Sequence, residues 1–260
     1  MRWRLAVVGS PIAHSLSPLL HEKGLAMAGL EGTSTRVELG REQGPALREL
    51  LDSAYDAVSV TMPLKKVAAG LCTQLDEVAT RIGVVNSVLV RDGELRGACT
   101  DGRGFVDSLA GEFGLTVTGK HVVVLGAGGA AHGIIDALVE ANVGSVAVQN
   151  RTPTTVRELT DRYDTVVADA PLGAPVDLIV NTIPTSGRPD VAVLHDGVHE
   201  QTLAVDIIYE PRMSNWRAFY ESHGCRSANG LGMLAYQAAR QMQWWWDTPM
   251  DGAQLLEVLQ

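Results

Sequence analysis

The stretch VVVLGAGGAAHG, residues 122–133, constrains the fold of this chain more than any other feature. Gly126, Gly128 and Ala131 satisfy the pattern G-x-G-x-x-G/A, and a continuous β-branched run precedes them. Such a run is typical of a strand buried on both faces of a parallel sheet. Because a helical pattern follows and another strand pattern closes the unit, the segment predicts a Rossmann-type βαβ unit that binds a dinucleotide.

The end of the next strand predicts which dinucleotide binds. An NAD site usually places Asp or Glu there to bond the ribose 2′-hydroxyl. This chain has Asn150, Arg151 and Thr152 instead, with no acid. A guanidinium can pair with a 2′-phosphate, and Asn150 and Thr152 can donate hydrogen bonds to it. These residues therefore favour NADP.

Strand and helix patterns alternate twice along the chain. Before the fingerprint, strands are expected at 3–9, 34–39 and 56–63, helices at 16–30, 42–53, 65–75, 76–83 and 101–114, and a hairpin at 84–100 that turns at Asp92-Gly93. The second series has strands at 119–129, 145–152, 177–184 and 201–209 and helices at 130–142, 153–163, 230–246 and 250–259. This alternation predicts an α/β protein of two units with parallel sheets.

Composition excludes several classes of function. The chain has 260 residues, 46% of them hydrophobic, and a net charge of −9 that argues against nucleic-acid or anionic-membrane binding. No apolar run reaches the length of about 18 residues that a membrane-spanning helix needs. The scattered Cys72, Cys99 and Cys225 fit a reducing cytoplasm. His195 and His199 lack a third ligand, so no metal site is expected. The sequence makes no prediction of oligomeric state.

The half before the fingerprint carries polar residues next to expected strand ends, where ligands bind in open α/β sheets. They are Ser15, Ser17, Thr61, Lys65, Asn86 and Asp101. Four of them also have a structural interpretation. The serines could cap a helix, Lys65 could be a solvated lysine, and Asp101 beside two glycines could be a plain turn.

Eight stretches in order resemble the shikimate dehydrogenase family. They are GSPIAHSLSPLLH, VSVTMPLK, VVNSV, CTDGRG, GAGGAA, NRT, DIIYEP and GLGMLAYQ, and they run from residue 9 to residue 237. The resemblance implies a substrate domain at 1–100 plus 230–260 and a Rossmann NADP domain at 101–229. C-terminal helices return to the first domain, and the crevice between the domains brings nicotinamide to substrate.

The same resemblance implies an activity and a role for each matching residue. The activity is the reversible NADPH-dependent reduction of 3-dehydroshikimate to shikimate in the chorismate and aromatic amino acid pathway. Lys65 and Asp101 would be the catalytic pair, either of which could exchange the proton. The substrate-binding set would be Ser15, Ser17, Thr61, Asn86, Tyr209 and Gln237. The cofactor-binding set would be Gly126, Ala127, Gly128, Gly129, Ala130, Asn150, Arg151, Thr152, Gly230 and Met233.

Three positions depart from the family pattern. Cys99 stands where the family usually has Asn. Thr155 stands where many NADP-using members have a second Arg, with Arg157 nearby. The family's Asn-Ala-Thr after the fifth strand becomes NTIPTSG here, so Asn181 is kept in a changed loop. Two alternatives stay open, namely a paralogue that oxidises quinate with NAD and a non-catalytic NADP-binding sensor.

Overall fold

The computed structural model describes residues 2–168, 174–184 and 195–260. The chain divides into two compact units, which we call unit 1 (Met1–Ser108 and Leu234–Gln260) and unit 2 (Leu109–Met233). The first division falls inside α5 (Asp101–Phe113) instead of at residue 100, and the second falls inside α9 (Leu231–Trp246) instead of at residue 230. The beginning of α5 belongs to unit 1 because it packs tightly on α9, where a Cβ on Gly104 would clash with the backbone of Gln237.

Unit 1 contains a six-stranded sheet in the order β2-β1-β3-β5-β6-β4. Its strands are β1 (Arg2–Gly9), β2 (Glu31–Glu38), β3 (Ala57–Val60), β4 (Gln74–Leu75), β5 (Ser87–Arg91) and β6 (Glu94–Ala98). The sheet is mixed, because β5 runs antiparallel to both β3 and β6. The expected hairpin turn accounts for the pairing of β5 with β6, since Asp92 and Gly93 both have positive φ, at 54° and 77°.

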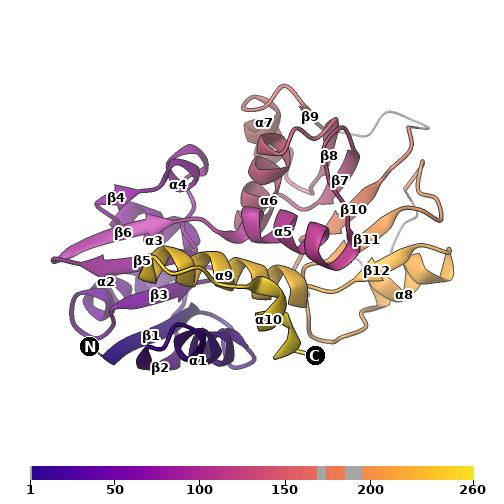
Figure 1. Cartoon of the computed structure of the whole chain (residues 1–260). Coiled ribbons are helices and arrows are strands. Elements are labelled where there is room, and N and C mark those ends of the chain that lie inside the picture. Colours follow the sequence, from indigo (N-terminus) through magenta and orange to yellow (C-terminus); the bar gives the residue numbers. More distant parts are fainter. Residues whose placement is uncertain (1, 169–173, 185–194) are drawn as a thin grey trace. The chain divides into compact units, whose positions relative to one another are not determined.

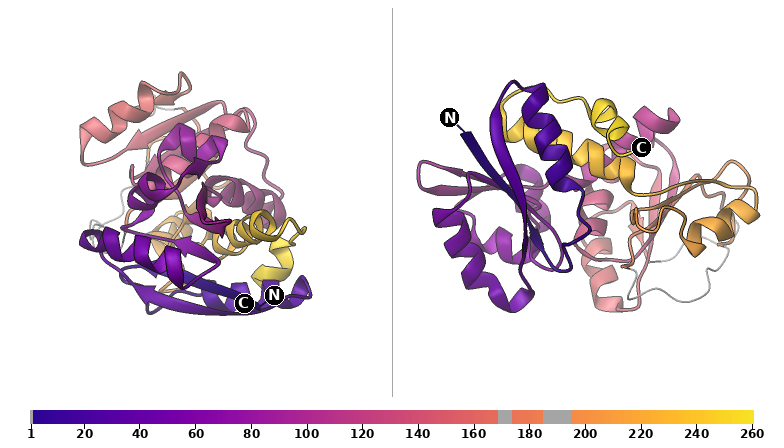
Figure 2. Two further views of the ribbon diagram at one scale, coloured as in Figure 1. Left: turned by 90° about the vertical axis from the view of Figure 1, so that its left-hand side faces the viewer. Right: turned by 90° about the horizontal axis from the view of Figure 1, so that it is seen from below.

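Helices cover both faces of this sheet (Figures 1 and 2). They are α1 (Ser17–Met27), α2 (Gly44–Ser53), α3 (Lys65–Leu71), α4 (Glu77–Ile82), most of α9, α10 (Gly252–Glu257) and the short 3₁₀ turn η1 (Arg41–Gln43). Val58 and Val60 belong to the core that contains Leu47 and Leu51 of α2. Ser59 lies between them and therefore points to the opposite face, which α1 and α9 cover.

Unit 2 has the strand order of a doubly wound nucleotide-binding fold. Its sheet runs β12-β11-β10-β7-β8-β9, and every pairing is parallel. The strands are β7 (His121–Leu125), β8 (Ser145–Gln149), β9 (Val166–Val167), β10 (Leu178–Asn181), β11 (Leu203–Asp206) and β12 (Arg226–Ala228). The order places β7 and β10 side by side at the centre, where strand progression reverses.

The helices of unit 2 lie on both faces of its sheet. Val123 and Ile179 pack with Trp216 and Tyr220 of α8 (Asn215–Ser222). The other face carries α6 (Gly129–Glu140) and α7 (Pro153–Thr160), as Figure 1 shows. No described helix of either unit is long and apolar enough to span a membrane.

Candidate functional site

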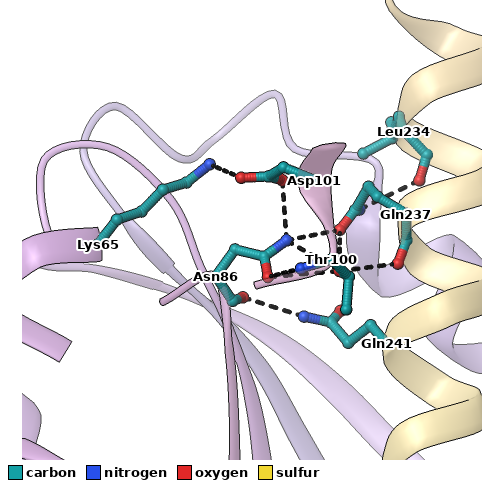
Figure 3. A network of polar contacts seen from close by, with 7 residues as sticks. All are labelled: Lys65, Asn86, Thr100, Asp101, Leu234, Gln237 and Gln241. Carbon is teal, nitrogen blue, oxygen red and sulfur yellow. Dashed lines mark hydrogen bonds and ion pairs between the residues drawn. The ribbon is translucent and has the colours of Figure 1, made fainter. Parts of the chain in front are cut away.

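Lys65 and Asp101 form a buried ion pair in unit 1 (Figure 3). The Lys65 Nζ atom lies 2.5 Å from Oδ2 of Asp101, and the two side chains are 15% and 7% exposed. Both residues stand at helix starts, Lys65 opening α3 and Asp101 opening α5. The positive end of a helix dipole stabilises the carboxylate and disfavours the ammonium. Helix stability therefore does not explain a lysine at this position.

The surroundings of Lys65 keep it protonated. Burial lowers the pKa of Lys65 and is the largest single effect on it. The charge of Asp101 and its hydrogen bond act in the opposite direction and together prevail, so the pKa lies above its ordinary value of 10.5. Lys66, one residue later, is exposed.

Asn86 connects this pair to α9. Its Nδ2 atom lies within hydrogen-bond distance of Oδ1 of Asp101 at 2.8 Å and Oε1 of Gln237 at 3.1 Å, as well as Oγ1 of Thr100 at 3.0 Å. Its Oδ1 accepts a hydrogen bond from the backbone N–H of Thr100 at 2.8 Å. Asn86 is 3% exposed, so these contacts satisfy an amide that water scarcely reaches. The structure brings together Lys65, Asn86, Asp101 and Gln237.

A second buried series of hydrogen bonds reaches the backbone carbonyl of Asn86, and the sequence analysis did not predict it. Gln241 donates from Nε2 to the backbone carbonyl of Asn86 at 3.0 Å and accepts from the Ser59 hydroxyl at 2.5 Å. The Ser59 oxygen also contacts Nε2 of His21 at 2.9 Å, and Nδ1 of His21 contacts the Ser34 hydroxyl at 2.8 Å. A signal for it did exist in the sequence, since Gln237 and Gln241 lie four residues apart in an apolar helix.

The direction of this series of hydrogen bonds fixes the tautomer of His21. The Ser59 hydroxyl donates its one proton to Gln241. His21 must therefore donate from Nε2 to Ser59 and accept at Nδ1 from Ser34. The ring is fully buried and packs edge-on against Trp245, with centroids 5.2 Å apart. Burial lowers the pKa of His21 to about 4. The imidazole is therefore neutral and has a structural role.

Ser15, Ser17 and Thr61 follow neighbouring strand ends. The serines come after β1 and Thr61 directly follows β3, and these strands are parallel with Val8 opposite Val60. Ser17 is buried and opens α1, whose N-cap residue Leu16 has no capping side chain. The Ser15 hydroxyl oxygen accepts a 3.3 Å hydrogen bond from the backbone N–H of Ser17. Ser15 therefore fulfils part of the helix-capping role that is one of the two interpretations of the serines.

Cys99 lies beside the ion pair. It is 2% exposed, and burial raises the pKa of its thiol well above the ordinary range. The thiol is therefore neutral, and the position that usually carries an amide in the family holds a smaller group with only weak hydrogen-bonding capacity.

The glycines of unit 2 fit a bound dinucleotide. Gly126 has φ 101°, and a Cβ there would clash with Oγ1 of Thr182, so the turn itself requires glycine. Gly128 caps α6, has negative φ, and a Cβ there would meet no atom within 4 Å. Neither packing nor backbone conformation explains glycine at that position, whereas the close approach of a pyrophosphate does. No side chain caps α6 and no acid lies in its first turn, leaving its N–H groups for an anion.

The remaining predicted cofactor residues also belong to unit 2. Ala127, Gly129 and Ala130 complete the turn into α6, and Asn150, Arg151 and Thr152 follow β8. Arg151 and Thr152 are exposed, and among the described residues none forms a hydrogen bond or ion pair with the Arg151 guanidinium. Gly230 packs on the backbone of Ile207, where a side chain would clash, and Met233 is buried. Tyr209 is half-buried in the loop between β11 and α8.

Two departures noted in the sequence fall on the same unit. Asn181 ends β10, and its Oδ1 accepts a hydrogen bond from the backbone N–H of Ile183 at 3.1 Å. The following residues 185–187 lie outside the described residues. Arg157 is exposed on α7.

Within the described ranges, no group of three or more His, Cys, Asp or Glu side chains could hold a metal ion.

Comparison with known proteins connects both units to one family. The model of the shikimate dehydrogenase substrate binding domain matches residues 7–88, and that of shikimate / quinate 5-dehydrogenase matches residues 108–179. A shikimate dehydrogenase (NADP(+)) of an Exiguobacterium species is 35% identical over an alignment of 262 positions, which covers 98% of this chain and 98% of the relative. The counterpart from Geobacillus kaustophilus is 35% identical over 92% of this chain and 91% of its own length.

Solved structures agree with this relationship. Shikimate 5-dehydrogenase from Thermus thermophilus, in complex with NADP(H) and shikimate, has a TM-score of 0.86 and 34% identity over 98% of both chains. A 5-ketofructose reductase from a Gluconobacter strain has a TM-score of 0.83 and 25% identity over 100% of this chain and 98% of its own. Two family models match the chain, and relatives of 35% identity match it over more than nine-tenths of its length. This chain therefore belongs to the shikimate dehydrogenase family.

Proposed function

We propose that this protein catalyses the reversible NADPH-dependent reduction of 3-dehydroshikimate to shikimate. The observation that carries the proposal is the buried Lys65–Asp101 pair, joined through Asn86 to Gln237. The relatives named shikimate dehydrogenase (NADP(+)) and the neighbour solved with NADP(H) and shikimate support the choice of substrate and cofactor.

The chemistry of the pair suits this reaction. Reducing a ketone to an alcohol adds a hydride to carbon and a proton to oxygen. The nicotinamide nucleotide, when bound, supplies the hydride. Lys65 carries a proton because Asp101 raises its pKa, so its ammonium can donate to the oxygen or stabilise the developing alkoxide. Asp101 orients that ammonium, and we assign the proton to Lys65 rather than to Asp101.

The other polar groups of unit 1 suit a small hydroxylated acid. Asn86 and Gln237 present amides that can bond ring hydroxyls, and Thr61 adds a hydroxyl from the end of β3. Ser15 and Ser17 would bind the carboxylate, with Tyr209 as a further contact. In unit 2, the turn from Gly126 to Ala130 would hold the pyrophosphate, and Asn150, Arg151 and Thr152 would surround the 2′-phosphate. Gly230 and Met233 would lie near the nicotinamide. Three free cysteines support a reducing compartment such as the cytoplasm.

The test is NADP reduction followed at 340 nm with shikimate, with quinate and NAD as the alternative substrate and cofactor. We expect turnover with shikimate and NADP that survives chelator treatment. Faster turnover with quinate and NAD would favour the paralogue. Absence of turnover despite NADP binding would favour the sensor. Loss of activity on chelation would contradict a metal-free reaction.

A further inference from the structure

The loop that follows β8 is held by a closed set of hydrogen bonds. The Thr155 hydroxyl oxygen accepts from Nδ2 of Asn150 at 2.6 Å, and its proton goes to the backbone carbonyl of Thr152 at 2.8 Å. Nδ2 of Asn150 also lies 3.3 Å from the same carbonyl. Three groups on either side of Arg151 therefore bond one another, all within unit 2.

This arrangement changes the part that Asn150 can play. The sequence suggested that its amide donates to a 2′-phosphate, but Nδ2 is engaged inside the loop. Thr152, by contrast, is the N-cap of α7 without a capping side-chain bond, so its hydroxyl is not used there. Exposed Arg151 stands between two residues whose positions are set by Thr155. The loop thus presents one guanidinium and one hydroxyl outward on a fixed backbone.

We propose that Thr155 is a positioning residue that determines preference for the 2′-phosphate by fixing the loop that carries Arg151 and Thr152. The inference rests on the proposed NADP function and deepens it. Thr155 carries a hydroxyl and no charge. A prearranged loop loses less conformational entropy on binding, so the order that Thr155 gives the loop favours binding of the 2′-phosphate.

The experiment uses two probes that differ only in the phosphate, 2′,5′-ADP and 5′-AMP, titrated by calorimetry into the full chain. Thr155→Val keeps the shape of the side chain and removes its hydroxyl. We expect it to weaken 2′,5′-ADP about three- to tenfold, the effect of one lost hydrogen bond, and to leave 5′-AMP unchanged. Thr155→Ser restores a hydroxyl and should bind as the wild type does. Thr154→Val is the matched control, since Thr154 is exposed and makes no hydrogen bond within the described part of the chain.

A double-mutant cycle separates positioning from a general effect on the fold. If Thr155 acts through Arg151, Thr155→Val should weaken 2′,5′-ADP little further once Arg151→Ala is present. A purely structural effect would add its full loss in both backgrounds. The melting temperature of each variant, without ligand, confirms that the same folded state is compared.

Several outcomes would overturn the inference alone. They are unchanged 2′,5′-ADP binding by Thr155→Val, equal loss for both probes, the same loss in Thr154→Val, and additivity in the cycle. If the wild type prefers 2′,5′-ADP over 5′-AMP in those cases, the proposal of NADP as the cofactor still holds. If the wild type binds both probes equally, the NADP assignment itself fails and the inference fails with it.

Discussion

The Nε2 atom of Gln241 donates to the backbone carbonyl of Asn86 at 3.0 Å, while Asn86 donates to Gln237 one helical turn earlier. Helix α9 thus forms hydrogen bonds with both the main chain and the side chain of Asn86. Replacing Gln241 by Leu removes one of the two hydrogen bonds to this carbonyl, which keeps the bond from the Val60 N–H, and it leaves the buried Ser59 proton without its acceptor. We expect the free energy of unfolding to fall by about 1–3 kcal/mol. Gln243→Leu, on the exposed side of α9, should change it little, and equal effects in urea titrations would contradict the role of the bond.

Lys65 and Lys66 offer a matched pair for the catalytic assignment. Lys65→Ala removes the proton carrier, so kcat should fall at least about a hundredfold, with a smaller change in the KM for shikimate. Lys66→Ala, an exposed position, should stay near wild type. Steady-state kinetics decides between them, and a defect confined to Lys66→Ala would mean that the wrong lysine has been assigned.

Asp101 should control the pH range of the reduction. In the wild type, Asp101 outweighs burial and holds the pKa of Lys65 above 10.5, so the ammonium persists through alkaline pH. In Asp101→Asn, the two effects of Asp101 that raise the pKa of Lys65 are lost, and burial, the largest effect, lowers that pKa. The residual rate of 3-dehydroshikimate reduction should therefore decline at lower pH than in the wild type. Asp107→Asn removes a carboxylate that pairs with Arg240 and serves as the control. Superimposable pH profiles for the wild type and Asp101→Asn would remove the basis for this coupling.

His21 should make unit 1 less stable in mild acid. Its pKa is about 4 when folded and 6.5 when exposed, so between these values only the unfolded chain takes up the proton. Stability is thus present above pH 6.5 and is lost as the pH falls toward 4. The loss from this residue between pH 7 and pH 5 should be about 2 kcal/mol.

Urea unfolding followed by tryptophan fluorescence measures this loss, because Trp3, Trp244, Trp245 and Trp246 all belong to unit 1. His21→Gln should show a smaller decline with acid than the wild type. His223→Gln, at an exposed position, should keep the full decline. A wild-type slope retained in His21→Gln would show that other groups cause it.

Arg151 should set the cofactor preference. A charge-assisted hydrogen bond contributes about 1.5–3 kcal/mol, so Arg151→Ala should raise the KM for NADP roughly tenfold to a hundredfold and hardly change that for NAD. Arg157→Ala tests the neighbouring cation on α7. Should the loss occur there instead, Arg157 would be the partner of the phosphate. Equal weakening of both cofactors would indicate that Arg151 only stacks on adenine.

Much of the fold follows from local sequence patterns. The β-branched run before Gly126 and the Asp92-Gly93 turn each have one good structural solution, and both form as predicted. The elements missed are short ones whose stability comes from their neighbours. They are β4, which continues a helical pattern, the two-residue β9, and the edge strand β12. Helix α8 did leave a sign, since Ser214 caps it and Trp216 and Tyr220 are four residues apart.

The candidate site divides in a similar way. Lys65 and Asp101 follow strand ends in the sequence and Asn86 directly precedes a strand, so they could be identified as candidates. The bonds of Asn86 to Gln237 and Gln241 join residues more than 150 positions apart. No local pattern specifies such a pairing, and the direction of the bonds that fixes the His21 tautomer depends on all of its members at once.

The return of α9 to unit 1 gives protein synthesis an order of events. The ribosome makes all of Leu109–Met233 before Gln237 and Gln241 exist, and domains generally fold as units, those nearer the N-terminus first. During that interval the amide of Asn86 and the hydroxyl of Ser59 lack Gln237 and Gln241, their partners on α9. A nascent chain can therefore complete the parallel sheet of unit 2 early, while the hydrogen-bond network around Asn86 is finished only when α9 leaves the exit tunnel.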